Sequence, residues 1–143
     1  MVSIRTATPA DLPAIVETAA RSLDTEAMLR WSFGEERFAE RIRLHFADID
    51  GENTRRGRIR ITDDGTGIAV WIPPDAREME DDAEAGSSEE EDLILGANAA
   101  RHAAFWGWVD GHEPDEPFLY LSHIGIRPEH QGEGLRTARM HDC

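Results

Sequence analysis

The most informative segment of the sequence is Ile124-Gly125-Ile126-Arg127-Pro128-Glu129-His130-Gln131-Gly132-Glu133-Gly134-Leu135. It continues an apolar run over residues 118–126, which predicts a strand that lies centrally in its sheet. Proline cannot donate to a strand ladder, so the strand is expected to end at residues 127–128. The glycine-rich turn that follows leads toward a helix. Such a turn can hold a phosphate, because glycine permits close backbone approach and free amides at a helix start point at the anion.

The sequence upstream of residue 118 predicts strands and helices in alternation. Residues 2–5 alternate as a short strand does, and residues 8–11 predict a helix start with Thr8 as its cap and an end near Leu23. In residues 58–72 two strand-like runs flank Asp64-Gly65, which predicts a hairpin. Residues 24–50 carry a helical pattern, in which His45 is expected at the surface or rim. Its apolar positions are Met28, Trp31, Phe38, Ile42 and Phe46.

Residues 75–92 are the most polar part of the chain, with ten acidic residues and one arginine. Charge of one sign at this density disfavours compaction, so a mobile surface segment is expected there. A helix is predicted across residues 91–110, on the apolar stripe formed by Leu93, Ala97, Ala100, Ala104 and Trp108. A length of 143 residues suits one domain over 1–143.

The composition excludes several classes of function. A net charge of −14 argues against binding nucleic acid or an anionic membrane and favours a cationic small molecule or basic peptide. No apolar run could span a bilayer and no signal-peptide core is present, so a cytoplasmic protein is expected. The single cysteine, Cys143, excludes a cysteine-based zinc site, and no metal is expected. All 15 basic residues are arginine, which is typical of a GC-rich bacterial genome and excludes a P-loop lysine.

The segment 124–135 resembles the central motif of the GCN5-related N-acetyltransferases (GNATs), in which an apolar-x-Pro step precedes Arg/Gln-x-x-Gly-x-Gly/Ala. Residues 4–11, 69–74 and 114–121 resemble other parts of bacterial members, in the same order along the chain. The resemblance implies an α+β fold with a mixed, mostly antiparallel sheet flanked by helices. It also implies transfer of an acetyl group from acetyl-CoA to an amine of a small molecule or peptide.

Carried over residue by residue, the resemblance implies two cofactor segments. The backbone of Ile124, Gly125 and Ile126 would pair with the pantetheine arm of coenzyme A like an added strand. The pyrophosphate would be held by amides of Gln131, Gly132, Glu133, Gly134, Leu135 and Arg136. The last of these departs from the family, which has glycine or alanine at that position.

The reaction needs a base to take the amine proton and an acid to protonate the leaving thiolate. His123 is our candidate base, because histidine titrates in the useful range, with His112 and Glu113 as alternatives. In the family the acid is often a tyrosine from the C-terminal part of the domain. The only tyrosine of this sequence, Tyr120, does not match that position.

The family continues beyond this motif with more helix and strand, whereas residues 136–143 are polar. We therefore expect a C-terminally incomplete domain that lacks the last strands. Two alternatives to an active enzyme stay open: an inactive truncated remnant of the family, and an acidic interaction module that uses residues 75–92. The sequence leaves the oligomeric state, including a homodimer, undecided.

Overall fold

A computed structural model describes residues 2–76 and 88–132 of the chain. Helices and strands follow one another in an α+β arrangement, with a long helical connection between the third and fourth strands. The elements are β1 (Ile4–Thr6), α1 (Leu12–Ser22), α2 (Ala27–Phe33), α3 (Phe38–Arg55), β2 (Ile59–Thr62), β3 (Gly67–Ile72), α5 (Ser88–Ile94), α6 (Ala99–Asp110) and β4 (Tyr120–Ile126). Three short 3-10 turns accompany them: η1 (Pro9–Asp11), η2 (Gly96–Asn98) and η3 (Pro128–His130).

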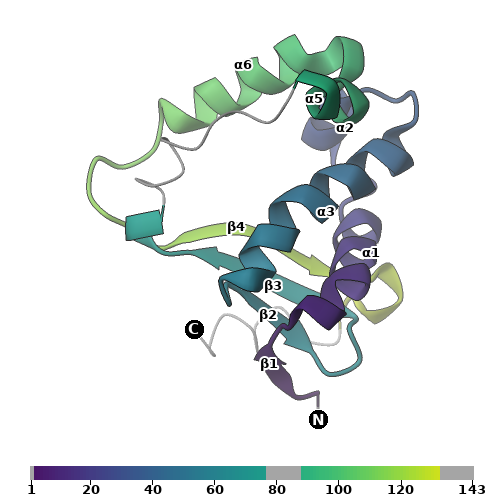
Figure 1. Ribbon diagram of the computed structural model, residues 1–143, viewed down its shortest axis with the longest axis vertical. Helices are drawn as coiled ribbons and strands as arrows, with labels where there is room; N and C mark the ends of the chain where they lie inside the picture. Colours follow the sequence, from purple (N-terminus) through teal and green to yellow (C-terminus); the bar gives the residue numbers. More distant parts are fainter. Residues whose placement is uncertain (1, 77–87, 133–143) are drawn as a thin grey trace.

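The four strands form one sheet in the order β1-β2-β3-β4, with every neighbouring pair antiparallel (Figure 1). The expected α+β class and the hairpin over residues 58–72 are therefore confirmed. In the described part of the chain β4 pairs with β3 and stands at the end of the order, so the prediction of a central strand is wrong there. High apolar content did not say how many strands flank this one: residues 120–124 are half-buried, and only Gly125 and Ile126 are buried.

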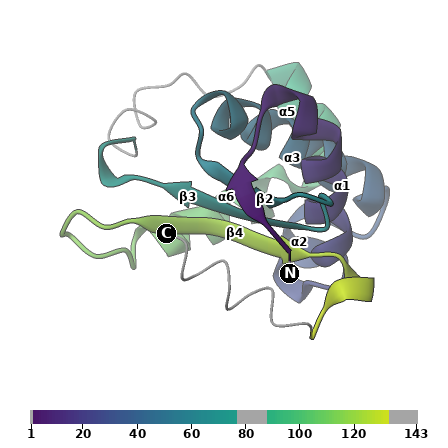
Figure 2. The ribbon, with the colours of Figure 1, turned by 90° about the horizontal axis from the view of Figure 1, so that it is seen from below.

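The hydrophobic core lies between the sheet and the helices α1 and α3. The register sets Ile59 opposite Val70 and Ile61 opposite Ile68, so these four side chains share one face of the sheet, and each is at most 1% exposed. Figure 2 shows α1 and α3 on one side of β3 and β4. Ile15 of α1 and Ile42 of α3 complete the same cluster. Alternation with period two thus produced the buried face that the hairpin pattern predicted.

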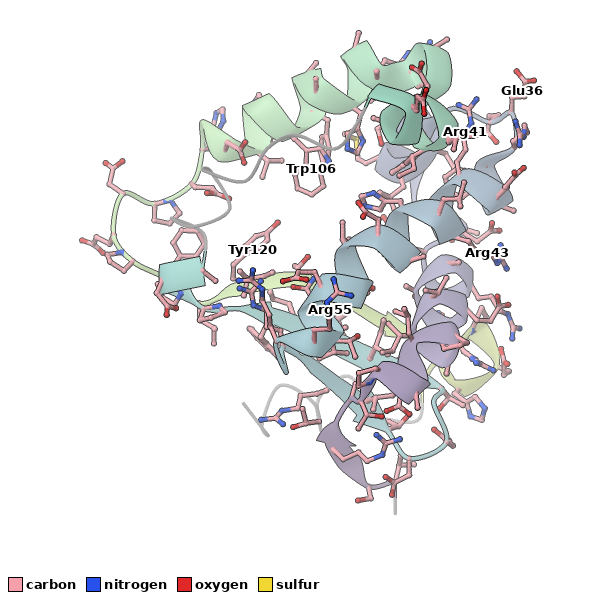
Figure 3. The ribbon with its side chains drawn as sticks, viewed as in Figure 1. Glu36, Arg41, Arg43, Arg55, Trp106 and Tyr120 are labelled. Carbon is pink, nitrogen blue, oxygen red and sulfur yellow. The ribbon has the colours of Figure 1, made fainter. Side chains whose placement is uncertain are left out.

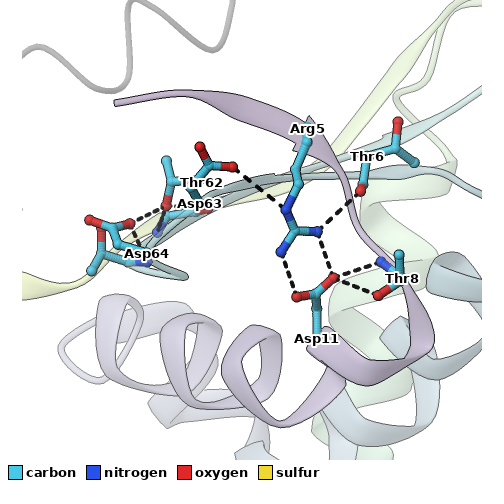
Figure 4. Close-up of polar contacts among 9 residues, drawn as sticks. Arg5, Thr6, Thr8, Asp11, Thr62, Asp63 and Asp64 are labelled. Atoms are coloured by element: carbon cyan, nitrogen blue, oxygen red, sulfur yellow. Dashed lines mark hydrogen bonds and ion pairs between the residues drawn. The ribbon is translucent and has the colours of Figure 1, made fainter. Parts of the chain in front are cut away.

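Polar contacts fix the passage from β1 into α1 (Figure 4). The guanidinium of Arg5 donates two hydrogen bonds of 2.8 Å to the carboxylate of Asp11, which also accepts the backbone amide of Thr8 at 2.8 Å. The hydrogen bonds from Arg5, followed by that from the Thr8 amide, hold the pKa of Asp11 well below its usual range. The predicted helix start at Thr8 is confirmed, with Asp11 as the reciprocal partner of a capping box.

The turn of the predicted hairpin is built around Asp64. Its Oδ1 accepts hydrogen bonds from the hydroxyls of Thr62 and Thr66 and from the Thr66 amide, at 2.7, 2.8 and 3.0 Å. Burial raises the pKa of this carboxyl, but the threonine hydrogen bonds outweigh it and lower the value to about 2. Gly65 has φ +71°, the left-handed backbone that favours glycine. The Asp-Gly pair therefore forms the turn that the sequence predicted.

Residues 24–55 form two helices where the sequence analysis expected one pattern. The chain turns at Gly34, whose φ is +77°, and α3 then starts at Phe38. The apolar positions of α3 are buried as expected. On α2, however, Met28 and Trp31 are each 47% exposed, and it is Phe33 that enters the core with no exposed surface. The break at Gly34 changes the direction of the chain between α2 and α3. One helical spacing of apolar residues therefore does not mark the buried face of both helices.

The connection between β3 and β4 packs its helices onto α2 and α3. The predicted helix over 91–110 is divided at Gly96, where φ is +53°. The carbonyl of Phe33 accepts hydrogen bonds from Arg41 Nη1 at 3.0 Å and from Asn98 Nδ2 at 2.9 Å, which ties α2, α3 and η2 together. The predicted apolar stripe is exposed: Leu93 and Trp108 are each 62% accessible. Most of the acidic segment expected over 75–92 lies outside the described residues.

No helix in the described ranges is both long and apolar enough to cross a membrane.

Candidate active site

The outer edge of β4 carries the backbone groups that sequence analysis assigned to a cofactor. The Arg127 amide donates to the Thr66 carbonyl at 2.9 Å, and the Trp71 amide donates to the Arg58 carbonyl at 3.0 Å on the opposite edge of β3. Bonding alternates along an antiparallel pair, so the amides and carbonyls of Ile124 and Ile126 face away from β3. These two residues can therefore bond to an extended chain laid beside β4.

Gly125, between them, has a packing role. A Cβ built on it would lie 2.4 Å from Ser22 Oγ and 3.2 Å from Ser22 Cβ. Its face of β4 therefore lies directly against the last turn of α1, and the absence of a side chain permits that close approach. The family resemblance implied a coenzyme A contact for the backbone of Gly125, whereas the amide and carbonyl of this residue belong to the β3 side of the strand.

Side chains of α1 hold the start of the loop after β4. Arg127 Nε donates to Thr18 Oγ1 at 3.0 Å, and that hydroxyl donates to the Gly65 carbonyl at 2.6 Å. Arg21 forms a two-pronged pair with Glu129, at 3.0 and 3.1 Å. The loop therefore leaves β4 in a direction fixed by α1 and by the β2–β3 turn.

The first two residues of the predicted pyrophosphate loop are described. Gln131 Nε2 donates to the outward-facing carbonyl of Ile126 at 3.2 Å. Gly132 has φ +92°, and a Cβ built on it meets no atom of residues 2–76 or 88–132 within 4 Å. The turn is thus open around Gly132 and adopts a backbone that favours glycine. The remaining predicted contacts lie outside the described residues: Glu133, Gly134, Leu135 and Arg136.

His123, the predicted base, points from β4 toward α3. Its Nε2 lies 3.0 Å from Oδ2 of Asp50, and its Nδ1 lies 3.2 Å from Oγ of the neighbouring Ser122. The ring of Phe46 packs against it, with centroids 5.0 Å apart. The imidazole is 9% exposed and the carboxylate of Asp50 is fully buried. The histidine is therefore held on both nitrogens and packed against an aromatic ring.

A bulge in β4 decides which side chains accompany His123. Val70 pairs with His123, but Trp71 pairs with Leu121, so Ser122 is the extra residue on β4. Ile72 pairs with Tyr120, which places Tyr120 on the same face as His123 although three positions separate them. Figure 3 shows Tyr120 and Trp106 of α6 directed toward one another. Aromatic side chains thus border the face that carries the histidine.

A second histidine lies beside this group, in a cluster of rings. His45 packs edge to face against Phe33, Phe46 and His102, with centroids 4.9, 5.3 and 5.9 Å apart. It was expected at the surface or rim; it keeps some accessible surface but lies inside this cluster. Burial first, then the charges of His102 and His123, lower the pKa of His45 to about 3. Its neutral form is therefore the one that the fold accommodates.

This lowered pKa predicts a loss of stability in acid. An unfolded chain takes up a proton on His45 below about pH 6.5, whereas the folded chain does not until about pH 3. Stability from this group is complete above pH 6.5 and falls as the pH drops toward 3. Between pH 7 and 4.5 we expect a loss of about 1–2 kcal/mol, less than the full linkage value because part of the residue is accessible.

The measurement is urea unfolding of the wild type and of His45→Phe at both pH values. The variant should lose less stability between the two than the wild type does. Phe38→Leu, a core change on the same helix without a titrating group, is the control and should keep the wild-type pH dependence. Equal pH dependence in His45→Phe and the wild type would contradict the prediction.

The alternative base candidates lie elsewhere. His112 follows the end of α6, is exposed, and its Nδ1 lies 2.7 Å from the Trp108 carbonyl, with the two rings stacked. Glu113 follows it in the same connection. Neither residue is on β4, so of the three candidates it is His123 that the structure brings onto the strand of the cofactor segment.

A pocket of about 260 Å³ lies beside η3. Its lining residues are Ala20, Arg21, Asp24, Ala39, Arg43 and Pro128. The two arginines are paired with Glu129 and Glu17. This pairing neutralises both cations, so the pocket offers no surplus positive charge to a phosphate. Among residues 2–76 and 88–132 no group of three or more histidine, cysteine or acidic side chains could hold a metal.

No protein-family model matches the sequence. The structure does match a solved one, described as "histone acetyltransferase HPA2 and related acetyltransferase" from Corynebacterium glutamicum. The TM-score is 0.63 at 20% sequence identity, and the match covers 99% of this chain and 68% of the other. The described chain therefore has the GNAT fold, as the sequence resemblance implied.

Sequence reasoning missed Asp50, Ser122 and His102. Asp50 lies 73 positions from His123, and its place in a helix rich in charged residues gave no signal that it is buried. Ser122 precedes a histidine on a strand, where alternation would send the two side chains to opposite faces. A bulge is the feature that brings them together, and no residue in the run 118–126 marks it.

Proposed function

We propose that this chain binds acetyl-CoA along the outer edge of β4 and transfers the acetyl group to an amine. The proposal rests on the outward-facing backbone groups of Ile124 and Ile126, which the chain follows with η3 and a glycine turn at Gly132. The solved structure of the same fold is named for acetyltransferases, which supports acetyl transfer as the reaction class.

The charge of the chain fits the two substrates in different ways. Acetyl-CoA is an anion, and the proposed loop would bind its pyrophosphate through backbone amides, which does not require a positive surface. The acceptor amine is a cation before it reacts, and a net charge of −14 attracts it over a long range. An amine-bearing small molecule or peptide is therefore the acceptor class that we propose.

The chemistry needs a group that takes a proton from the attacking amine. His123 is the proposed base, because it lies on the strand that would hold the thioester arm and contacts a buried carboxylate. Acetyl-CoA supplies the activated acyl group. The protein would orient it along β4, limit water through the apolar surroundings of Phe46, and remove the amine proton.

The deciding experiment is calorimetric titration of the purified chain with acetyl-CoA, followed by measurement of thiol release with a panel of amines. Saturable binding and amine-dependent thiol release are expected. Absence of binding at millimolar acetyl-CoA would overturn the proposal and favour an acidic interaction module. Binding without release to any amine would favour an inactive remnant of the fold.

Gly132→Asp tests the loop. The residue has φ +92° in an open turn, so aspartate would strain the backbone and bring a negative charge beside the pyrophosphate amides. We expect affinity for acetyl-CoA to fall by at least about tenfold, a change of about 1.4 kcal/mol. Gly57→Asp is the matched control, since Gly57 is exposed and has φ +69° at the end of α3. Equal affinity in both variants would contradict the assignment of this loop.

A further inference from the structure

Asp50, His123 and Ser122 form one hydrogen-bonded chain from the core to β4. The first link, Asp50 Oδ2 to His123 Nε2, measures 3.0 Å, and the second, His123 Nδ1 to Ser122 Oγ, measures 3.2 Å. They come from α3 and from the bulge of β4. The side chain of Asp50 is fully buried, that of His123 is 9% exposed, and Ser122 as a residue is half-buried.

The bulge is what makes the second link possible. On a regular strand Ser122 and His123 would point to opposite faces of the sheet. Because Ser122 has no partner residue on β3, the strand bends there and the serine hydroxyl reaches the neighbouring imidazole. Bulges recur beside functional sites because they re-aim a side chain in this way.

The partners determine which nitrogen carries the proton. An ionised carboxylate only accepts hydrogen bonds, so Nε2 of His123 must donate to Asp50. In the neutral imidazole Nδ1 is then the acceptor, and the hydroxyl of Ser122 donates to it. His123 is thereby held with its basic nitrogen facing Ser122.

The burial of Asp50 is unusual in one respect. Asp50 is 0% exposed, and its Oδ1 has no hydrogen-bond partner among the described residues. A buried carboxylate oxygen without a partner costs stability, and a neutral residue of the same size would avoid that cost. This argues that the acid is present for what it does to His123 and not for the stability of the core.

We propose that Asp50, His123 and Ser122 act as a proton relay for the proposed acetyl transfer, with Asp50 as a positioning residue. The amine reacts in its neutral form, after its ammonium proton has gone to solvent, and attacks the carbonyl carbon of the thioester. Ser122 Oγ accepts an N–H proton of the attacking amine while its own proton moves to Nδ1 of His123. As the new C–N bond forms, the C–S bond breaks and its electron pair leaves on sulfur. The imidazolium returns its extra proton to that sulfur by the same route, giving an amide and a free thiol.

The first test needs no substrate, although the proposal as a whole rests on the proposed function. Long-range ¹H–¹⁵N NMR of the full chain reports which nitrogen of His123 is protonated at neutral pH. We expect the proton on Nε2 in the wild type and in Ser122→Ala. In Asp50→Asn the amide can donate as well as accept, so the Nε2–H form should lose population. A wild-type proton on Nδ1 would overturn the relay.

The second test is kinetic, with acetyl-CoA and the amines spermidine, tyramine and a lysine-containing peptide as probes. Asp50→Asn and Ser122→Ala should each lower kcat at least about tenfold and leave KM for acetyl-CoA within about twofold. Asp48→Asn, an exposed aspartate on the same helix, is the control and should match the wild type. Wild-type kcat in both test variants, or an acetylated Ser122 in mass spectrometry, would overturn the relay.

The two proposals fail in different ways. If the wild type does not bind acetyl-CoA, the transferase and the reaction assigned to the relay both fall, whatever the NMR result. If it binds and turns over but the Nδ1–H form is found, the relay alone falls. Ser122→Ala is the second test variant in case Asp50→Asn does not fold. Ser122 is only half-buried, so its replacement by alanine leaves the core intact.

Discussion

Replacing Phe33 with alanine is expected to destabilise the chain by about 3–5 kcal/mol, the usual cost of removing a fully buried phenylalanine. Phe33 has no exposed surface. Its ring packs edge to face against His45 of α3 and His102 of α6, with ring centroids 4.9 and 5.0 Å apart. It therefore joins the helices of the β3–β4 connection to those before β2. The cavity left by alanine would open in the middle of that junction.

Urea unfolding followed by far-ultraviolet circular dichroism would measure this loss. Met28→Ala is the matched control, because Met28 lies on the same helix but is 47% exposed, and its change should stay within about 0.5 kcal/mol. A cost below about 1 kcal/mol for Phe33→Ala would mean that the junction is not part of the cooperative core.

The second large effect concerns the close approach of α1 to β4. Gly125→Ala should destabilise the chain by about 1–3 kcal/mol, because the added Cβ would stand 2.4 Å from Ser22 Oγ and 3.2 Å from Ser22 Cβ. Rotation of the serine can relieve the first contact. The second requires the helix or the strand to move.

A double-mutant cycle separates this cause from any other role of the glycine. Ser22→Gly removes both clashing atoms, so the cost of Gly125→Ala should shrink to below about 1 kcal/mol in that background. If Gly125→Ala costs the same in the wild type and in the Ser22→Gly background, packing against α1 is not the reason for the glycine. Acetyl-CoA affinity of the double variant should match that of Ser22→Gly, since Gly125 bonds toward β3.

Local sequence patterns predicted the fold correctly at those places where the structure depends on neighbouring residues alone. Thr8 and Asp11 form the helix start, and Asp64-Gly65 forms the hairpin turn, because capping and turn geometry depend on neighbouring residues. The helical spacing of apolar residues predicted less well which side chains are buried. Trp108 and Leu93 looked like a buried stripe but are exposed, since the face that a helix buries depends on what packs against it.

Residues 124–132, at the end of β4 and in the turn after it, show the same division. The sequence alone predicted that a strand ends at Arg127-Pro128 and leads into a glycine turn, because proline and glycine act through their own backbone geometry. Only the tertiary structure decided that Ile124 and Ile126 face outward and that Gly125 packs on α1. It also joined Asp50 to His123 across 73 positions, since that contact depends on how α3 crosses the sheet and on a bulge that no local pattern marks.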